Sequence, residues 1–298
     1  MRWLNLVWLT AGVAAVSCCE SSASDTDAAD ATDGTDIDAT DGTDGDAPPE
    51  AACVEAGEAH VETREVWANI SVSFELAVPS GQPRLSASAM MCRCSPPLEV
   101  AEVVAGPGGC TVARNLGALP TADVCTALDA GTVTISAGGT DFVLESWEGA
   151  PCFLTADGAT PTISAGDPVR VRSTGGTDIA AFDVSLDVPP DVEPTRPVDD
   201  GRFTRCAPWR FEWTTEPAAH ASVGITGGVG ETPYSLTCSP VSSPFDVPAA
   251  LTSAWPGPGA AQAFAETFEE QTVPGTIPVT IKVRNSFSGA ASVTIESP

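Results

Sequence analysis

The chain has 298 residues and carries 40 Asp and Glu against 13 Lys and Arg, which gives a formal net charge of −27. A surface with this excess of carboxylates repels phosphate backbones, so DNA and RNA are excluded as partners. The length is sufficient for one large domain or two ordinary ones.

The first 17 residues have the composition of a secretory signal. Arg2 is the only charged residue before Glu20, and an apolar run at residues 3–16 follows it. The run is too short to cross a bilayer comfortably, and small residues precede Cys18, as a signal peptidase requires. We therefore predict that residues 1–17 are a signal peptide that is removed on export.

The segment Ala15-Val16-Ser17-Cys18 resembles the lipobox of bacterial lipoproteins. The resemblance implies that Cys18 receives a diacylglycerol, which would anchor the chain to a membrane of the cell envelope, at the outer membrane or the cell surface. Two features depart from the family's pattern: Ala15 stands where Leu is commonest, and Cys19 offers a second thiol. The alternative is an ordinary cleaved signal followed by incidental cysteines.

Residues 18–52 contain eleven acids and no base, and the octad at 31–38 is followed by a near copy at 39–46. Such a segment buries too little apolar area to offset its ordering entropy, so we predict a disordered acidic linker behind the lipidated cysteine. The alternative is a calcium site, with oxygen ligands from Asp36, Asp38, Asp41 and Asp44. The octads do not supply the order of ligands that an EF-hand needs.

The folded part begins near Cys53 and shows the alternation of half-buried strands. Seven apolar residues in strict period two, from Val66 to Val78, alternate with mostly polar neighbours. The same alternation recurs at residues 132–135, 169–172, 182–188, 277–283 and 293–295. This pattern, with Gly and Pro turns between short strands, predicts an all-β fold, an antiparallel β-sandwich. Short helices are expected at residues 121–128 and from Pro248, and residues 260–270 fit either a helix or a strand.

A run rich in Pro and Asp, Pro189 to Asp200, follows the strand expected at 182–188. Proline does not fit inside a central strand, so this run is predicted to link two β units. The first is a disulfide-bonded unit at residues 53–190, and the second comprises residues 191–298.

In the second unit, Cys206, Trp213 and Cys238 resemble the two cysteines and core tryptophan of immunoglobulin domains, at a spacing too short for a true member. The resemblance implies an Ig-like β-sandwich architecture and no function. Residues 125–251 also resemble, loosely, secreted lipoproteins of myxobacteria and their relatives. The segments that carry this likeness are Leu128-Asp-Ala-Gly-Thr-Val133, Ala165-Gly-Asp-Pro-Val169, Ala181-Phe-Asp183, the Trp213 strand and Cys238. It implies no activity.

Beyond the anchor the chain has an even number of cysteines, namely Cys53, Cys92, Cys94, Cys110, Cys125, Cys152, Cys206 and Cys238. In an exported protein this predicts four disulfides, whose pairing the spacing does not fix. We expect Cys206 to pair with Cys238, because no other cysteine follows Cys152, and we expect three bonds in the first unit. Cys92 and Cys94 are too close in an extended chain to pair with each other. The alternative is a soft-metal site for Cu(I) at residues 90–94 with His60.

The sequence contains no nucleophile elbow, zinc-protease or dinucleotide-binding motif, and its folded part has two histidines, His60 and His220. We therefore expect no catalytic residue, no cofactor and no metal ligand. The aromatic strand at residues 209–213 is a sugar-binding platform or a core strand, and the core is favoured because aromatics dominate core burial. Trp255, beside a Pro-Gly turn, and Trp147 are the candidate exposed ligand contacts.

These observations predict a non-catalytic cell-envelope lipoprotein whose ectodomain mediates a surface interaction. Its expected partners are the membrane, through the lipid anchor, and another envelope protein or a glycan. The alternatives are a carbohydrate-binding module and a hydrolase whose site is not local in the sequence.

Overall fold

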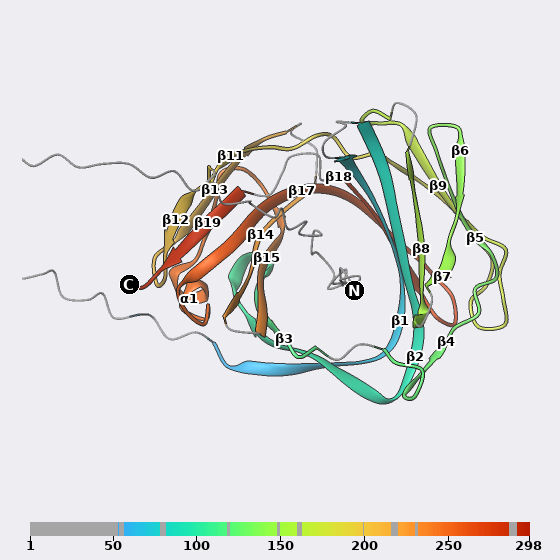
Figure 1. Ribbon diagram of the computed structural model, residues 1–298, viewed down its shortest axis with the longest axis horizontal. Coiled ribbons are helices and arrows are strands. Elements are labelled where there is room, and N and C mark those ends of the chain that lie inside the picture. Colours follow the sequence, from blue (N-terminus) through green and yellow to red (C-terminus); the bar gives the residue numbers. More distant parts are fainter. Residues whose placement is uncertain are drawn as a thin grey trace, which may run out of the picture. The chain divides into compact units, whose positions relative to one another are not determined.

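The computed structural model describes residues 53, 57–77, 82–117, 120–147, 150–159, 163–198, 200–215, 220–229, 232–285 and 291–298 (Figure 1). The segment Ala52–Pro298 forms one compact unit. The predicted signal peptide, the lipidation site Cys18 and the acidic linker lie outside the described residues and stay predictions. The regular secondary structure of the described residues is almost entirely β-strand, which confirms the all-β class.

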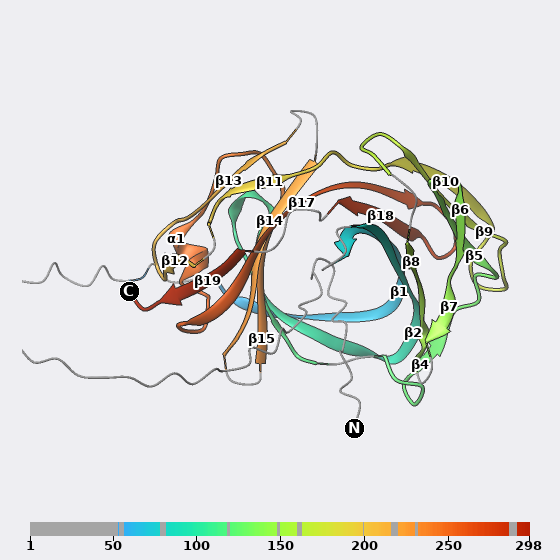
Figure 2. The ribbon, with the colours of Figure 1, turned by 45° about the horizontal axis from the view of Figure 1, so that its top comes forward.

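The largest sheet closes on itself, because β1 pairs with β18 on one edge and with β2 on the other. We call its seven-stranded ring the closed sheet (Figures 1 and 2). In spatial order it consists of β1 (Ala59–Ala77), β18 (Val279–Asn285), β17 (Gly259–Val273), β14 (His220–Val229), β15 (Thr232–Val241), β3 (Cys110–Asn115) and β2 (Gln82–Ala105). Five strands extend it: β4 (Cys125–Ala127), β7 (Glu145–Trp147), β8 (Ala150–Ala159), β12 (Gly201–Thr204) and β19 (Ala291–Glu296).

Ring closure depends on two unusually long strands, β1 with 19 residues and β2 with 24. Their pairing has register shifts at Glu62/Thr63 and Arg64/Val66, and such bulges bend a strand and increase its twist. After the second shift, Val66 is exposed and Trp67 is buried, the reverse of the predicted burial of these two residues. The smaller sheets do pack face to face on the largest sheet. The expected Ig-like sandwich is nevertheless not formed, because the largest sheet closes into a ring.

A four-stranded sheet packs on the outer face of β1, β2 and β18 (Figure 2). Its spatial order is β10 (Phe182–Asp187), β9 (Pro168–Ser173), β5 (Val133–Ala137) and β6 (Thr140–Val143). Alternate apolar side chains from both sheets form the first core, which includes Val72 and Phe74 of β1 and Val169 and Val171 of β9. The strands predicted at 132–135, 169–172 and 182–188 are confirmed.

A three-stranded sheet and one short helix cover the outer face of β3, β14, β15 and β17, where they enclose the second core. They are β11 (Glu193–Arg196), β13 (Trp209–Thr214), β16 (Phe245–Val247) and α1 (Ala249–Thr252). The alternation in β13 buries Trp209, Phe211 and Trp213 and exposes Arg210, so the core interpretation of these aromatics is confirmed. The described residues include no helix with the length and apolarity needed to cross a membrane.

The predicted division into units at residues 53–190 and 191–298 is wrong as a domain boundary. The chain does pass from the first core at Val188 to the second at Val192. However, Ile281 and Val283 of β18 belong to the first core, and Val112 of β3 belongs to the second. Ring closure requires strands from both halves, and each core includes residues from both halves.

The loop before β5 is held to the loop after β9 by the carboxylate of Asp129. This carboxylate accepts hydrogen bonds from the backbone N–H of Gly131 (2.8 Å) and of Thr177 (3.1 Å), and Asp178 accepts one from the Asp129 N–H (2.9 Å). The N–H of Gly131 and then that of Thr177 lower the pKa of Asp129 below 3.8, because they bind the ionised form. These hydrogen bonds join the two loops at one end of the four-stranded sheet.

We expect Asp129→Ala to lower the free energy of unfolding at pH 7, measured by urea titration. Because the pKa of Asp129 is depressed in the folded chain, its stabilisation is complete above pH 3.8 and is lost as pH falls through the folded value. The difference from the wild type should therefore narrow on acidification below pH 3.8. Asp187→Ala, at an exposed carboxylate on β10, is the matched control and should be neutral. If the loss of unfolding free energy in Asp129→Ala stays constant below pH 3.8, the ionised carboxylate of Asp129 does not stabilise these loops.

Candidate functional site on the inner face of the closed sheet

All eight cysteines of the folded part form disulfides, as predicted, but the pairing differs. The bonds are Cys53–Cys206, Cys92–Cys152, Cys94–Cys125 and Cys110–Cys238. The expected bond between Cys206 and Cys238 is wrong, since β15 lies beside β3 and places Cys238 directly opposite Cys110. Cys92 and Cys94 are not bonded to each other, as expected. Both are oxidised, which contradicts the Cu(I) alternative.

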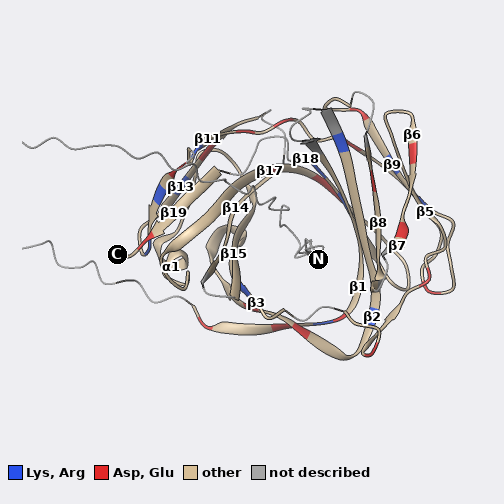
Figure 3. Cartoon of the chain, viewed as in Figure 1, with Lys and Arg blue, Asp and Glu red and all other residues tan. Residues whose placement is uncertain are grey.

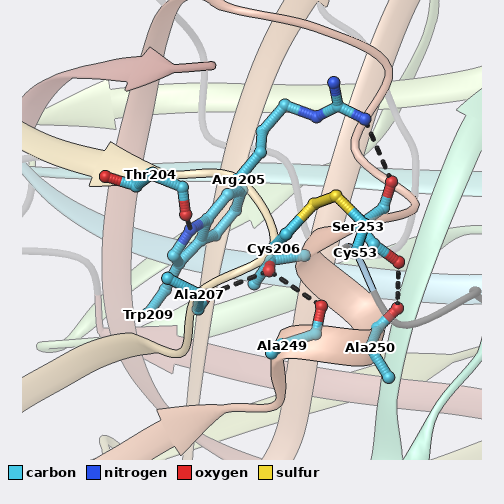
Figure 4. Close-up of a disulfide and its surroundings, with 10 residues drawn as sticks. Cys53, Thr204, Arg205, Cys206, Ala207, Trp209, Ala249, Ala250 and Ser253 are labelled. Carbon is cyan, nitrogen blue, oxygen red and sulfur yellow. Dashed lines mark hydrogen bonds between the residues drawn. A yellow bond between two sulfur atoms is a disulfide. The ribbon is translucent and has the colours of Figure 1, made fainter. Parts of the chain in front are cut away.

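The Cys53–Cys206 bond is the most accessible of the four, because Cys53 is exposed and Cys206 is half-buried, whereas the other six cysteines are buried. It ties the start of the folded part to the turn between β12 and β13, next to α1 (Figure 4). In that turn Cys206 adopts a positive φ of 64°. Arg205 donates a hydrogen bond to the carbonyl of Ser253 (3.2 Å), and the indole N–H of Trp209 bonds to the carbonyl of Thr204 (2.8 Å).

Trp255, predicted as an exposed contact, is only 2% exposed and belongs to the second core, which is a correction. Its ring packs edge-on against Trp209, with centroids 5.9 Å apart. The ring also lies 6.3 Å from that of Tyr234, measured between centroids. Trp147 is the last residue of β7, and its side chain lies outside the described part.

A shallow groove of about 600 Å³ lies on the solvent side of the four-stranded sheet. Its charged residues have partners, since Arg172 lies 3.6 Å from Asp141 and Asp183 pairs with Arg170. The groove is a solvated sheet face with its charges compensated, so it is a weak candidate for a site.

The inner face of the closed sheet carries a polar network instead. We define the inner face as the set of side chains that alternate with those of the two cores. On β18, Ile281 and Val283 enter the first core, so Lys282 and Arg284 point inward. On β17, Ala265 enters the second core, and Glu266 points inward.

Glu266, Lys282 and Arg284 form a buried charge network with two serines. Lys282 Nζ lies 3.6 Å from Glu266 Oε1, and Arg284 Nη1 lies 3.6 Å from Oε2. Ser222 of β14 donates its hydroxyl to Glu266 Oε1 (3.0 Å). Arg284 donates to Ser71 of β1 from Nε (3.1 Å) and Nη2 (2.6 Å). Four strands of the closed sheet thus meet in one network.

Lys282 is the only lysine of the chain, and its ammonium lies 3.9 Å from the centre of the Phe268 ring. Burial lowers the pKa of Lys282, because desolvation penalises the charged form, and Arg284 lowers it further; Glu266 and Glu270 oppose this. Its side chain is 23% exposed, against 7% for Glu266, so the network borders solvent on the lysine side. Elsewhere Lys, Arg, Asp and Glu are spread thinly along the strands (Figure 3), and ion pairs such as that of Arg210 with Asp246 lie on exposed positions.

The network offers cationic hydrogen-bond donors to a molecule on the inner face. An ammonium has three donors and a guanidinium five, and one carboxylate cannot accept from all of them. His220 is exposed at the start of β14, and its ring centroid lies 6.1 Å from that of Phe268. His60 is also exposed and lies on β1, outside the network.

Sequence reasoning missed Glu266, Lys282, Arg284 and Ser71. The available signal was Lys282 itself, a single lysine in a chain whose other basic residues are all arginine. The described residues contain no group of three or more His, Cys, Asp or Glu side chains placed to hold a metal ion. In comparisons with known proteins, no family model matches the chain, and no curated protein matches it.

Proposed function

We propose that the protein is a non-catalytic lipoprotein of the cell envelope, whose tethered ectodomain binds another molecule. The pairing of all eight cysteines of the folded part supports export, because such bonds persist in oxidising compartments. The lipobox-like segment before Cys18 and the acidic residues behind it support a tether.

The observation that carries the binding function is the charge network on the inner face. Burying charged groups is costly, and replacing buried ion pairs by apolar residues is often neutral or stabilising. Lys282 and Arg284 share a single buried carboxylate, Glu266, at distances beyond hydrogen bonding. Such an arrangement is a poor device for stability alone, and it supports a role in recognition.

The alternatives have less support. The carbohydrate-binding alternative depended on exposed tryptophans, and Trp255 is buried. A glycoside hydrolase needs two facing carboxyl groups. Glu266 is the one buried carboxylate among the described residues, and its near neighbours are cations.

The tether is tested at Cys18. Cells given an alkyne palmitate analogue should incorporate the label into the wild-type protein. Cys18→Ala should lose the label and the membrane anchoring, because the two acyl chains of a diacylglycerol on Cys18 supply the anchor. Cys19→Ala is the matched control and should keep both the label and the membrane anchoring. Label retained by Cys18→Ala and lost by Cys19→Ala would move the site by one residue. Label absent from the wild type would refute the lipoprotein proposal.

A further inference from the structure

We propose that the inner face of the closed sheet binds a small organic monoanion, with its acid group between Lys282 and Arg284 and its apolar part against Phe268. The proposal rests on the binding function above and names the class of ligand. It requires free donors, an accessible site, an apolar wall and a charge balance that suits one negative charge.

The donors are present on Lys282. Its ammonium faces the Phe268 ring and lies 3.6 Å from Glu266, which is longer than a hydrogen bond. Glu266 is the acceptor nearest to it among the described residues, and an ammonium has three donors, so one carboxylate oxygen does not occupy them all. A carboxylate or sulfonate oxygen placed beside it would fill a vacant donor direction and would also face the guanidinium of Arg284. Charge-assisted bonds of this kind are roughly twice as strong as neutral ones.

The network borders solvent at Lys282, whose side chain is 23% exposed. In register, Lys282 lies opposite Ser71 and Arg284 lies opposite Ser73 on the neighbouring strand β1. Ser73 in turn faces Ser86 of β2, which is exposed. A row of hydroxyls therefore leads from solvent to the two cations. Hydroxyls donate and accept, so they can orient an acid group without excluding water from it.

An apolar wall lies next to the cations. Phe268 is half-buried beneath Lys282, and Phe264 of the same strand is buried on the inner face. Gly224 of β14 makes room for this second ring, because a Cβ there would lie 2.6 Å from the Phe264 ring. Ligand sites combine mainly apolar walls with a few placed polar groups. The apolar wall suits an organic ligand better than an inorganic ion.

The local charge suits a single negative charge. Lys282 and Arg284 contribute two positive charges and Glu266 removes one, which leaves one positive charge among the buried groups. Glu270 lies opposite Lys282 in register but is exposed, so solvent screens it. His220 faces the same ring from the solvent side. A multiply charged anion would be repelled by Glu266 and by the net charge of −27.

The test uses two fluorescent probes with the same aromatic body. One is 8-anilinonaphthalene-1-sulfonate, a monoanion, and the other is N-phenyl-1-naphthylamine, which lacks the sulfonate. Both are titrated against the disulfide-intact protein, and folding of every variant is checked by circular dichroism. We expect Lys282→Gln to weaken the binding of the sulfonate roughly tenfold, as loss of one charge-assisted contact implies, and to change the binding of the neutral probe less than about twofold.

Two control variants sharpen the result. Lys282→Arg keeps the charge and should retain most of the sulfonate binding. Arg202→Gln removes a charge from an exposed ion pair with Glu296, outside the inner face, and should leave both probes unaffected.

Equal loss of both probes in Lys282→Gln would show apolar binding without recognition of the acid group and would overturn the inference. Unchanged binding of the sulfonate probe to Lys282→Gln would also overturn the inference. Absence of saturable binding of either probe to the folded wild type would also refute it, while the labelling of Cys18 would still decide the tether independently.

Discussion

Replacing Cys110 and Cys238 together by alanine is expected to lower the free energy of unfolding by about 5 kcal/mol, because this bond closes a long loop in the unfolded chain. The two cysteines are 128 residues apart in sequence and directly opposite on β3 and β15. Both are buried in the second core, so their loss also removes packed sulfur atoms. Since domains are stable by only about 5–15 kcal/mol, the effect is a large share of the total.

The matched control is the double replacement of Cys94 and Cys125. This bond also joins directly opposed, buried cysteines, but it spans 31 residues, so the same loop argument gives about 3.7 kcal/mol. Urea unfolding monitored by tryptophan fluorescence measures both variants, and non-reducing peptide mapping verifies the remaining bonds. A larger loss for the shorter loop would show that local packing, rather than loop length, dominates.

The cysteine pairing illustrates what distance in sequence cannot reveal. Cys206 and Cys238 are consecutive cysteines in the sequence, and for that reason a bond between them was expected. In the structure, β15 pairs with β3 from the first half of the sequence, and the turn before β13 reaches Cys53. The formation of four disulfides was predictable from the even number of cysteines and the expected oxidising compartment. The identity of the partners depends on the order of the strands in the sheet.

The strands themselves were predictable because half-buried strands alternate in polarity, as residues 169–172 do in β9. Alternation assigns residues to a face but does not identify the neighbouring strand. The parallel pairing of β1 with β18 brings together Ser71 and Arg284, which are 213 residues apart, and no local pattern encodes it.

The candidate site was missed for a related reason. Lys282 and Arg284 alternate with Ile281 and Val283, which is the ordinary pattern of a strand with one face in water. Once the sheet closes, this polar face becomes the inner face, and the two cations meet Glu266 from β17. The prediction for Trp255 was wrong in the opposite sense. The Pro-Gly turn beside it suggested an exposed ring, but the ring is buried in the second core.

The network also predicts a stability effect at Glu266. Glu266→Gln should keep the hydrogen bond from Ser222, since the amide oxygen also accepts, but it leaves Lys282 and Arg284 without their counter-charge. Removing one partner of a fully buried ion pair costs about 3–5 kcal/mol. Here Lys282 keeps contact with solvent, and we expect a loss of about 2–3 kcal/mol at pH 7, measured by urea unfolding.

The loss should depend on pH through Lys282. Its pKa in the folded chain lies below the ordinary 10.5, so between the two values the unfolded chain binds more protons and stability rises with pH. Glu266 opposes that lowering, so Glu266→Gln depresses the pKa further and widens the window. The deficit at pH 7 should therefore shrink as pH approaches 10.5. In a Lys282→Met background the deficit should be smaller and independent of pH over this range, because only the counter-charge of Arg284 is then lost. A deficit that shrinks equally in both backgrounds would mean that Lys282 is not the titrating group.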